Sequence, residues 1–371
     1  MNGKIVISLL LIIFITLLGY TLQPQTQANI SLSFEEEEVE LNRKAEISPF
    51  LDDFTAYMDN LLHERNIVGA AYAIVYKGQV VVLQSHGVKN AQTQDSVNSH
   101  TVFRLASLSK GFGGVMASKL HQSGVVNLDS TVVSYFPEFT LKRKVNQQTL
   151  TLRNVLSHSS GMVAHSFDPW IESNKSFNEI FNNFDVANIT HKPGERYSYQ
   201  NALYCLFDTV AYTATGKPVQ QLMKDSLFAP LGMTDASMTF EEFVGHENFA
   251  YPHARGRWGH YYPTRLNSRY YSVASAAGVN ASIYDMSKWL QALLGYKRSV
   301  VPHTVLHEIA EPQVKTPISY RARRNWNHIT KKEYGLGWRL ITAQGEQFVH
   351  HGGYVDGYRN EIAFCPNKKI G

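Results

Sequence analysis

Apolar side chains recur at helical spacing early in the chain, directly after a strongly acidic segment. Ser48-Pro49 suits a helix start, because serine caps the first turn and proline is tolerated at its first position. The apolar positions that follow are three or four residues apart: Phe50, Leu51, Phe54, Tyr57, Met58, Leu61 and Leu62. The spacing predicts a helix that buries one face and ends near Arg65.

Strand-like runs occur near both ends of the chain. Gly69–Tyr76 and Gln79–Leu83 flank Lys77-Gly78, which indicates a hairpin with a short turn. From Ser107 to about Leu294 the pattern is mainly helical and broken by loops. Strand signals return in the last part of the chain, at Tyr334–Ile341, Gln347–His350 and Asn360–Cys365.

This order predicts an α+β fold, in which both chain ends build one antiparallel sheet with flanking helices. We expect a sheet lobe from residues 48–104 and 333–371, and an inserted, mainly helical lobe from residues 105–332. A cleft between the two lobes is the expected place for a binding site.

The first 47 residues read as a targeting segment and a tether. Ile5–Leu22 is largely apolar and follows Lys4, so residues 1–28 are either an export signal or a membrane anchor. The length of the run favours an anchor, whereas Thr26-Gln-Ala28 offers small residues for cleavage. Either alternative predicts an exported protein that is periplasmic or otherwise outside the cytoplasm, and held at the inner membrane if uncleaved. Residues 29–47 carry six glutamates against two basic residues, which predicts a solvated acidic tether.

Composition narrows the possible chemistry. The 371 residues are 44% hydrophobic and 18% charged, which is ordinary for a globular protein with a sizeable core. The only two cysteines, Cys205 and Cys365, are expected to be small buried thiols. The fifteen histidines include no His-Glu-x-x-His, and no cysteine pair has zinc spacing, so neither a metal nor a cofactor is expected. The basic stretch around Arg321–Lys332 is expected to be a solvated loop, and no nucleic-acid partner is predicted.

Ser107-Leu-Ser-Lys110 is the most informative short segment. Residues three apart on a helix share a face, so the Lys110 amine can reach the Ser107 hydroxyl. Serine is a poor nucleophile unless an adjacent base activates it. The alternative is an ordinary helix start, with Ser107 as the cap and Lys110 in solvent.

Further motifs follow this tetrapeptide in a fixed order. They are Leu150-Thr-Leu-Arg-Asn-Val-Leu-Ser-His-Ser-Ser-Gly161, Pro193-Gly-Glu-Arg-Tyr-Ser-Tyr-Gln-Asn201, Pro230-Leu-Gly-Met233 and His351-Gly-Gly-Tyr-Val-Asp-Gly357. From about Ile67 to the end, the series resembles the class C β-lactamase and D-alanyl-D-alanine carboxypeptidase family of serine hydrolases, which includes penicillin-binding proteins. The resemblance implies the β-lactamase/transpeptidase-like fold and an acyl-enzyme on Ser107.

The resemblance also assigns roles to the middle motif. Tyr199-Gln-Asn201 is similar to the family's Tyr-x-Asn, so Ser107, Lys110 and Tyr199 are the expected catalytic residues. Asn201 would hold the Lys110 amine and the substrate amide. Either Lys110 or Tyr199 is the base for acylation; a phenol needs a nearby cation for this role, and Lys110 would supply it. Tyr358-Arg-Asn360 has the same spacing but leads into a strand, so we interpret it as sheet packing.

The last motif implies a substrate-binding strand. His351-Gly-Gly353 is similar to the family's third motif, and the glycine at Gly357 favours this register over one that starts at His350. Gly353 would let the substrate backbone approach the strand. By resemblance, the backbone N–H groups of Ser107 and Tyr354 would form the oxyanion hole. A histidine at this position and Gly352 in place of a hydroxyl residue weaken the case for a true β-lactamase.

The expected function is therefore an exported serine hydrolase that acts on a small molecule or peptide, namely a cell-wall peptide, an ester or a β-lactam. The alternative is a non-catalytic penicillin-recognising or scaffold protein that retains the fold. The chain ends at Gly371, where the family continues with a central strand and a helix. The sequence is thus expected to be a fragment of a longer product, and the mass of the native protein would test this.

Overall fold

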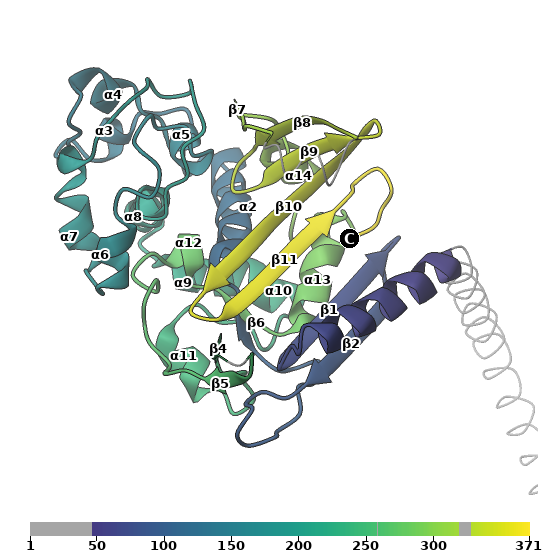
Figure 1. Ribbon diagram of the computed structural model, residues 1–371. Coiled ribbons are helices and arrows are strands. Elements are labelled where there is room, and N and C mark those ends of the chain that lie inside the picture. Colours follow the sequence, from purple (N-terminus) through teal and green to yellow (C-terminus); the bar gives the residue numbers. More distant parts are fainter. Residues whose placement is uncertain (1–46, 258, 319–327) are drawn as a thin grey trace, which may run out of the picture. The chain divides into compact units, whose positions relative to one another are not determined.

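The computed structural model describes residues 47–257, 259–318 and 328–371 (Figure 1). The apolar run, most of the acidic tether and residues Arg321–Arg324 of the basic stretch lie outside these ranges. A helix covers residues 47–64, as the sequence predicts. No helix in the described ranges has the length and apolar character needed to cross a membrane. The chain divides after Asp59, and the following description concerns residues 60–371.

The predicted hairpin is confirmed. Strands β1 (Gly69–Tyr76) and β2 (Gln79–Gly87) pair antiparallel. Lys77 and Gly78 both have positive φ, 46° and 86°, which gives a two-residue turn whose twist suits the flanking strands. Strand β2 extends four residues beyond the predicted end at Leu83.

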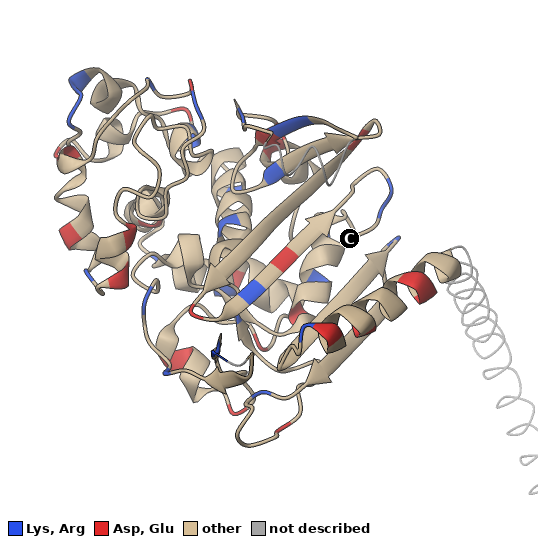
Figure 2. Ribbon diagram, viewed as in Figure 1, with Lys and Arg blue, Asp and Glu red and all other residues tan. Residues whose placement is uncertain are grey.

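A second antiparallel sheet has the strand order β11-β10-β9-β8-β7. Its strands are β7 (Val314–Lys315), β8 (Ile329–Tyr334), β9 (Arg339–Ala343), β10 (Glu346–Val355) and β11 (Tyr358–Phe364). The sheet thus includes residues from Val314 onward, earlier than the expected lobe boundary at residue 333. Figure 2 shows β10 almost free of charge beside β11, which carries Arg359 and Glu361.

Two strand boundaries in this sheet differ from the prediction. Tyr334–Ile341 is not one strand, because Gly337 at φ 76° turns the chain and the Gly335 N–H bonds to the Trp338 carbonyl. Strand β10 does not end at His350 but continues through the two glycines to Val355, since Gly352 and Gly353 pair with Glu361 and Asn360 of β11.

The last residues of the chain connect the two sheets. Gly371 accepts a hydrogen bond from the Val75 N–H of β1, and Lys369 accepts one from the Lys77 N–H just after β1. Ile370 accepts a hydrogen bond from the Cys365 N–H just after β11. Both chain ends therefore contribute to one α+β arrangement, and the expected fold class is confirmed. Among the described residues, no strand of the hairpin pairs directly with a strand of the five-stranded sheet.

Helices and short turns fill the middle of the chain. The helices are α2 (Ser109–Gln122), α3 (Val132–Tyr135), α4 (Lys144–Thr149), α5 (Leu152–Leu156), α6 (Asp168–Glu172), α7 (Phe177–Phe181), α8 (Leu206–Thr215), α9 (Val219–Met223), α10 (Ala229–Leu231), α11 (Phe240–Gly245), α12 (Ala274–Ala277), α13 (Ile283–Leu293) and α14 (His303–Ile309). Short helical turns of other types are η1 (Ala106–Leu108), η2 (Phe184–Val186), η3 (Leu203–Cys205) and η4 (Lys224–Phe228). Short strand pairs are β3 (Phe103–Arg104) with β6 (Asn280–Ala281), and β4 (His253–Arg255) with β5 (Tyr261–Pro263).

Helix α2 is the buried centre of the molecule, and small residues bring the sheet close to it. A Cβ on Gly111 would collide with the Trp338 ring, and one on Gly114 would collide with the Leu336 carbonyl oxygen. On another side, Phe112 stacks on Trp289 of α13 with ring centroids 4.2 Å apart. The turn between β8 and β9 therefore packs directly against the first two turns of α2.

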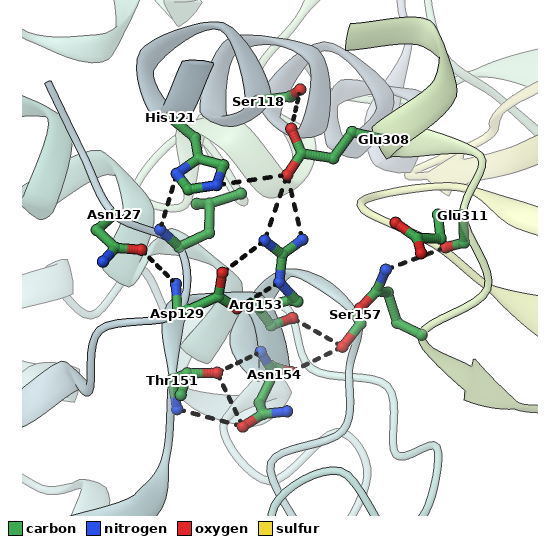
Figure 3. Close-up of polar contacts among 12 residues, drawn as sticks. Ser118, His121, Asn127, Asp129, Thr151, Arg153, Asn154, Ser157, Glu308 and Glu311 are labelled. Atoms are coloured by element: carbon green, nitrogen blue, oxygen red, sulfur yellow. Dashed lines mark hydrogen bonds and ion pairs between the residues drawn. The ribbon is translucent and has the colours of Figure 1, made fainter. Parts of the chain in front are cut away.

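A polar cluster surrounds the other end of α2 (Figure 3). Arg153 of α5 bonds to both carboxylate oxygens of Asp129, at 2.6 and 2.9 Å, and to Glu308 of α14 at 3.2 Å. Glu308 also accepts a 2.6 Å bond from the Ser118 hydroxyl of α2. We call Ser118, Asp129, Arg153 and Glu308 the outer cluster. It links α2, α5 and α14 through partly exposed charges.

Candidate active site

Ser107 lies in a tight turn that leads into α2. It is the middle residue of η1, and α2 begins two residues later. Ala106 has a left-handed φ of 50°, which is uncommon for a residue with a side chain, and its carbonyl accepts a 2.6 Å bond from Ser109. The turn places Lys110 Nζ 3.4 Å from Ser107 Oγ, so the proximity expected from the spacing is present.

The Lys110 amine is enclosed and has no contact with solvent. It donates to Asn201 Oδ1 at 2.7 Å and to the Ala276 carbonyl of α12 at 3.0 Å. Burial lowers the pKa of Lys110 to about 7, although the nearby Cys205 and Asp168 act in the opposite direction. At neutral pH a substantial fraction of Lys110 is therefore an uncharged amine, which is able to accept a proton.

Tyr199 contacts the same serine from another side. Its hydroxyl donates to Ser107 Oγ at 2.9 Å. Lys110 Nζ lies over the phenol ring, 4.6 Å from its centroid, rather than at the hydroxyl oxygen. Burial raises the pKa of Tyr199, despite the bond to Ser107. The expectation that Lys110 would favour a phenolate is therefore wrong, because desolvation dominates and keeps Tyr199 a neutral proton donor.

Asn201 connects Lys110 to an acidic residue that the sequence analysis did not identify. Its Nδ2 donates to both oxygens of Asp168, at 3.0 and 3.1 Å, while its Oδ1 accepts from Lys110. Burial raises the pKa of Asp168, but hydrogen bonds from His165 and Asn201 outweigh it and hold the pKa below its usual range. Asp168 is therefore a carboxylate at neutral pH.

The competing tyrosine motif has a structural role, as interpreted from the sequence. Tyr358 is buried in the sheet and donates its hydroxyl proton to the Ala250 carbonyl at 2.7 Å. Asn360 donates to the Arg104 carbonyl at 2.9 Å. His158, from the Ser-His-Ser-Ser-Gly motif, is likewise scaffolding, since its ring lies 4.3 Å from that of Tyr199 and accepts from the Gln200 N–H.

Strand β10 supports the serine turn more than it offers side chains to a ligand. A Cβ on Gly353 would collide with the Leu105 carbonyl oxygen, and it would lie 3.1 Å from the Ser107 nitrogen. The absence of a side chain at Gly353 thus lets the strand pack against η1, whereas the sequence analysis expected space for a substrate backbone. Tyr354 is 72% exposed and lies on the rim of the pocket.

His351 does not face the pocket, contrary to the substrate-binding role expected for it. Its side chain is completely buried, and Nε2 lies 3.0 Å from the Tyr334 hydroxyl. Burial lowers the pKa of His351 well below its ordinary value, so the imidazole is neutral. The ring thus lies behind the wall that Gly352 and Tyr354 present to the pocket.

A pocket of about 510 Å³ opens in front of Ser107. Residues of the predicted motifs line it, among them Ser107, Tyr199, Asn201 and Tyr354. His165, Asp168, Tyr270 and Arg339 also line it and were missed, because they reach it from separate segments. The His-x-x-Asp spacing of His165 and Asp168 is the one signal in the sequence that could have indicated a pair.

Arg339 supplies the positive charge of this pocket. Its guanidinium lies 5.6 Å from the ring centroid of Tyr199 and 5.9 Å from that of Tyr334. No carboxylate within the described part of the chain forms an ion pair with it. A guanidinium is charged at any physiological pH, so Arg339 favours an anionic group in the occupant of the pocket.

The chain is similar to known proteins in both sequence and fold. A sequence model of the β-lactamase family matches residues 54–371. The chain is 24% identical to a β-lactamase of Escherichia coli K12 over 84% of each protein. It is also 24% identical to the protein flp of Staphylococcus aureus, over 84% of this chain and 59% of that protein. The octameric penicillin-binding protein homologue from Pyrococcus abyssi superposes with a TM-score of 0.75, at 22% identity, over 86% of this chain and 72% of that one.

Proposed function

The chain belongs to the β-lactamase family, and from this premise we propose that it is a serine hydrolase that works through an acyl-enzyme on Ser107. The observation that carries the proposal is the pair of contacts to Ser107 Oγ, from Lys110 at 3.4 Å and from Tyr199 at 2.9 Å. A serine between a buried amine and a neutral phenol is arranged both to lose a proton and to pass one on.

In the proposed acylation step, the neutral Lys110 amine accepts the proton of Ser107 as Oγ attacks a carbonyl carbon. Tyr199 donates its phenolic proton to the leaving group and recovers a proton from Lys110. The lowered pKa of Lys110 and the raised pKa of Tyr199 support these roles, because they make the amine the base and the phenol the acid. The N–H groups of Ser107 and Tyr354 are the proposed oxyanion donors, each worth about 3–4 kcal/mol in comparable sites.

We propose an exported protein whose substrate is a cell-wall peptide, an ester or a β-lactam that carries an anionic group. Arg339 supports the anionic group, and the open pocket of about 510 Å³ has room for a small peptide or acyl chain. Residues 5–22 support export. Gly352 supplies no hydroxyl to a β-lactam carboxylate, so the peptide and the ester are favoured over the β-lactam.

Covalent labelling tests the proposal. A fluorophosphonate probe should label the wild-type protein and should not label Ser107→Ala, with Ser109→Ala as a comparison that keeps the probe-reactive serine. If Ser107→Ala were labelled as strongly as the wild type, Ser107 would be excluded as the nucleophile.

Turnover separates the hydrolase from the alternative scaffold protein. Nitrocefin, a short acyl ester and a D-Ala-D-Ala peptide should be compared side by side. Transient labelling with turnover of any of the three supports a hydrolase. A wild-type protein that is never acylated by the probe or by labelled penicillin would be a scaffold.

A further inference from the structure

His165 and Asp168 form a fixed pair in the same pocket as Ser107. Nδ1 of His165 lies 2.6 Å from Asp168 Oδ2, and both residues line the pocket. Because Asp168 is a carboxylate, Nδ1 carries the proton of this bond, and Nε2 is the ring nitrogen left to accept a proton from another group. Within the described ranges Nε2 has no hydrogen-bond partner, and 55% of the side chain is exposed.

The backbone at His165 is held in one conformation by hydrogen bonds. His165 has a left-handed φ of 61°, an uncommon conformation for a residue with a side chain. Two hydrogen bonds hold this conformation. The His165 N–H donates to the Tyr199 carbonyl at 2.9 Å, and the His165 carbonyl accepts from the Asp168 N–H at 3.2 Å. These bonds place the imidazole 5.3 Å from the Tyr199 ring, measured between centroids. The ring is therefore tied to the residue that contacts Ser107 Oγ.

The other proton acceptor of the site is poorly placed to meet water. Lys110 is completely buried, and its amine is surrounded by Ser107, Asn201 and the Ala276 carbonyl. Tyr199 is a donor with a raised pKa. His165, by contrast, is half exposed and lines the pocket in front of Ser107. An imidazole is the side chain that most often accepts a proton at neutral pH.

We propose that His165, oriented by Asp168, accepts the proton of the water molecule that releases the acyl group from Ser107. The inference rests on the proposed acyl-enzyme. The water oxygen bonds to the acyl carbon while one of its protons moves to Nε2 of His165. The bond between that carbon and Ser107 Oγ then breaks. Oγ takes the proton of the Tyr199 hydroxyl, and Tyr199 takes one back from the imidazolium. One water is consumed, and the acid and free Ser107 are formed.

The test is pre-steady-state hydrolysis of p-nitrophenyl acetate by the full chain, in which the burst reports acylation and the steady state reports release of the acyl group. His165→Asn is the chosen variant, because asparagine tolerates left-handed φ better than most residues. We expect acylation to stay near the wild-type rate and release to slow about 10²-fold, the lower end for a general base. Mass spectrometry should then show the acyl-enzyme accumulating. His191→Asn, outside the pocket, is the matched control.

Chemical rescue distinguishes a catalytic from a structural role. In His165→Gly, added imidazole should restore release, and it should not accelerate release by the wild type. Equal release by wild type and His165→Asn would overturn the inference. If the wild type never forms an acyl-enzyme, the proposed function itself fails.

Discussion

Two sets of polar residues contact α2, the active-site residues around Lys110 and the outer cluster, and they differ in their access to water. At the start of the helix, Lys110 has no exposed surface and contacts only neutral partners directly. In the outer cluster, at the other end, Arg153 and Glu308 retain some exposure and form an ion pair. Burial lowers the pKa of Lys110 to about 7, whereas the bond to Asp129 raises the pKa of Arg153 despite partial burial.

The comparison shows that two cations near one helix, Lys110 on α2 itself and Arg153 on the neighbouring α5, have opposite effects on the stability of the fold. A cation without a direct anionic partner costs folding free energy when it is desolvated, but it becomes a reactive amine. Arg153, a cation that is paired and partly hydrated, stabilises the contact between helices but is not a reactive group. Helix α2 thus begins with a destabilising functional cation, and its other end contacts a stabilising ion pair between α5 and α14.

The largest expected effect comes from removing the buried amine. Lys110→Met should lower the acylation rate by about 10²–10⁴-fold, the range for loss of a general base. It should also raise the melting temperature, since methionine fills similar space without the cost of desolvating a charge. Because the unfolded pKa is 10.5 and the folded pKa is about 7, the gain should be largest below pH 7 and shrink as pH rises toward 10. A lower melting temperature at pH 6 would contradict this account.

The pH dependence of acylation should follow the same amine. Below pH 7 Lys110 is mostly an ammonium ion and cannot accept a proton, so the rate of labelling by a fluorophosphonate should rise from pH 5 to 8 with its midpoint near 7. Residual labelling of Lys110→Met should lack this rise. A flat wild-type profile would exclude Lys110 as the base.

The outer cluster should show the opposite combination. Arg153→Met leaves Glu308, whose side chain is 13% exposed, without its cationic partner. The free energy of unfolding should fall by about 1.5–3 kcal/mol, as for the loss of a hydrogen bond between charged groups, while Glu308 keeps its bond from Ser118. Chemical denaturation measures this change, and the acylation rate of the folded protein should remain that of the wild type. A loss of activity without a loss of stability would show that the two ends of α2 are coupled.

The smallest effect is expected at the exposed edge of the same cluster. Asp129 is 60% exposed, so Asp129→Asn should cost only about 0.2–1 kcal/mol, and less at high salt. The hydrogen bond from Arg153 lowers the pKa of Asp129. The stabilisation should therefore be present above about pH 4 and be lost as pH falls through the lowered pKa. Paired with Arg153→Met, this variant separates the contribution of Asp129 from that of Glu308.

Local patterns predicted much of the fold and part of the site. The Lys77-Gly78 turn and the spacing of Ser107 and Lys110 depend on neighbours along the chain, so the sequence was sufficient for both. Strand β8 was not predicted, because Ile329–Tyr334 is mostly polar and its pairing with β9 and β7 makes it a strand.

The parts that could not be predicted depend on segments that meet only in the folded protein. The position of Arg339 in the pocket depends on the turn that packs on Gly111 and Gly114. Asp168 is joined to Lys110 only through Asn201. The direction of the Tyr199 pKa shift is set by desolvation in the folded protein, which a motif does not reveal.

The packing of Gly353 against the serine turn also determines when, during translation, the active site can form. Gly353 follows Ser107 by about 250 positions, so the ribosome must add these residues before the strand that supports the serine turn exists. At about 5–20 residues per second, this interval lasts roughly 12–50 s. Throughout that period the nascent chain already contains Ser107 and Lys110, but it lacks strand β10, which packs against the serine turn. The nucleophile is therefore expected to be inert until the strand that contains Gly353 has been synthesised.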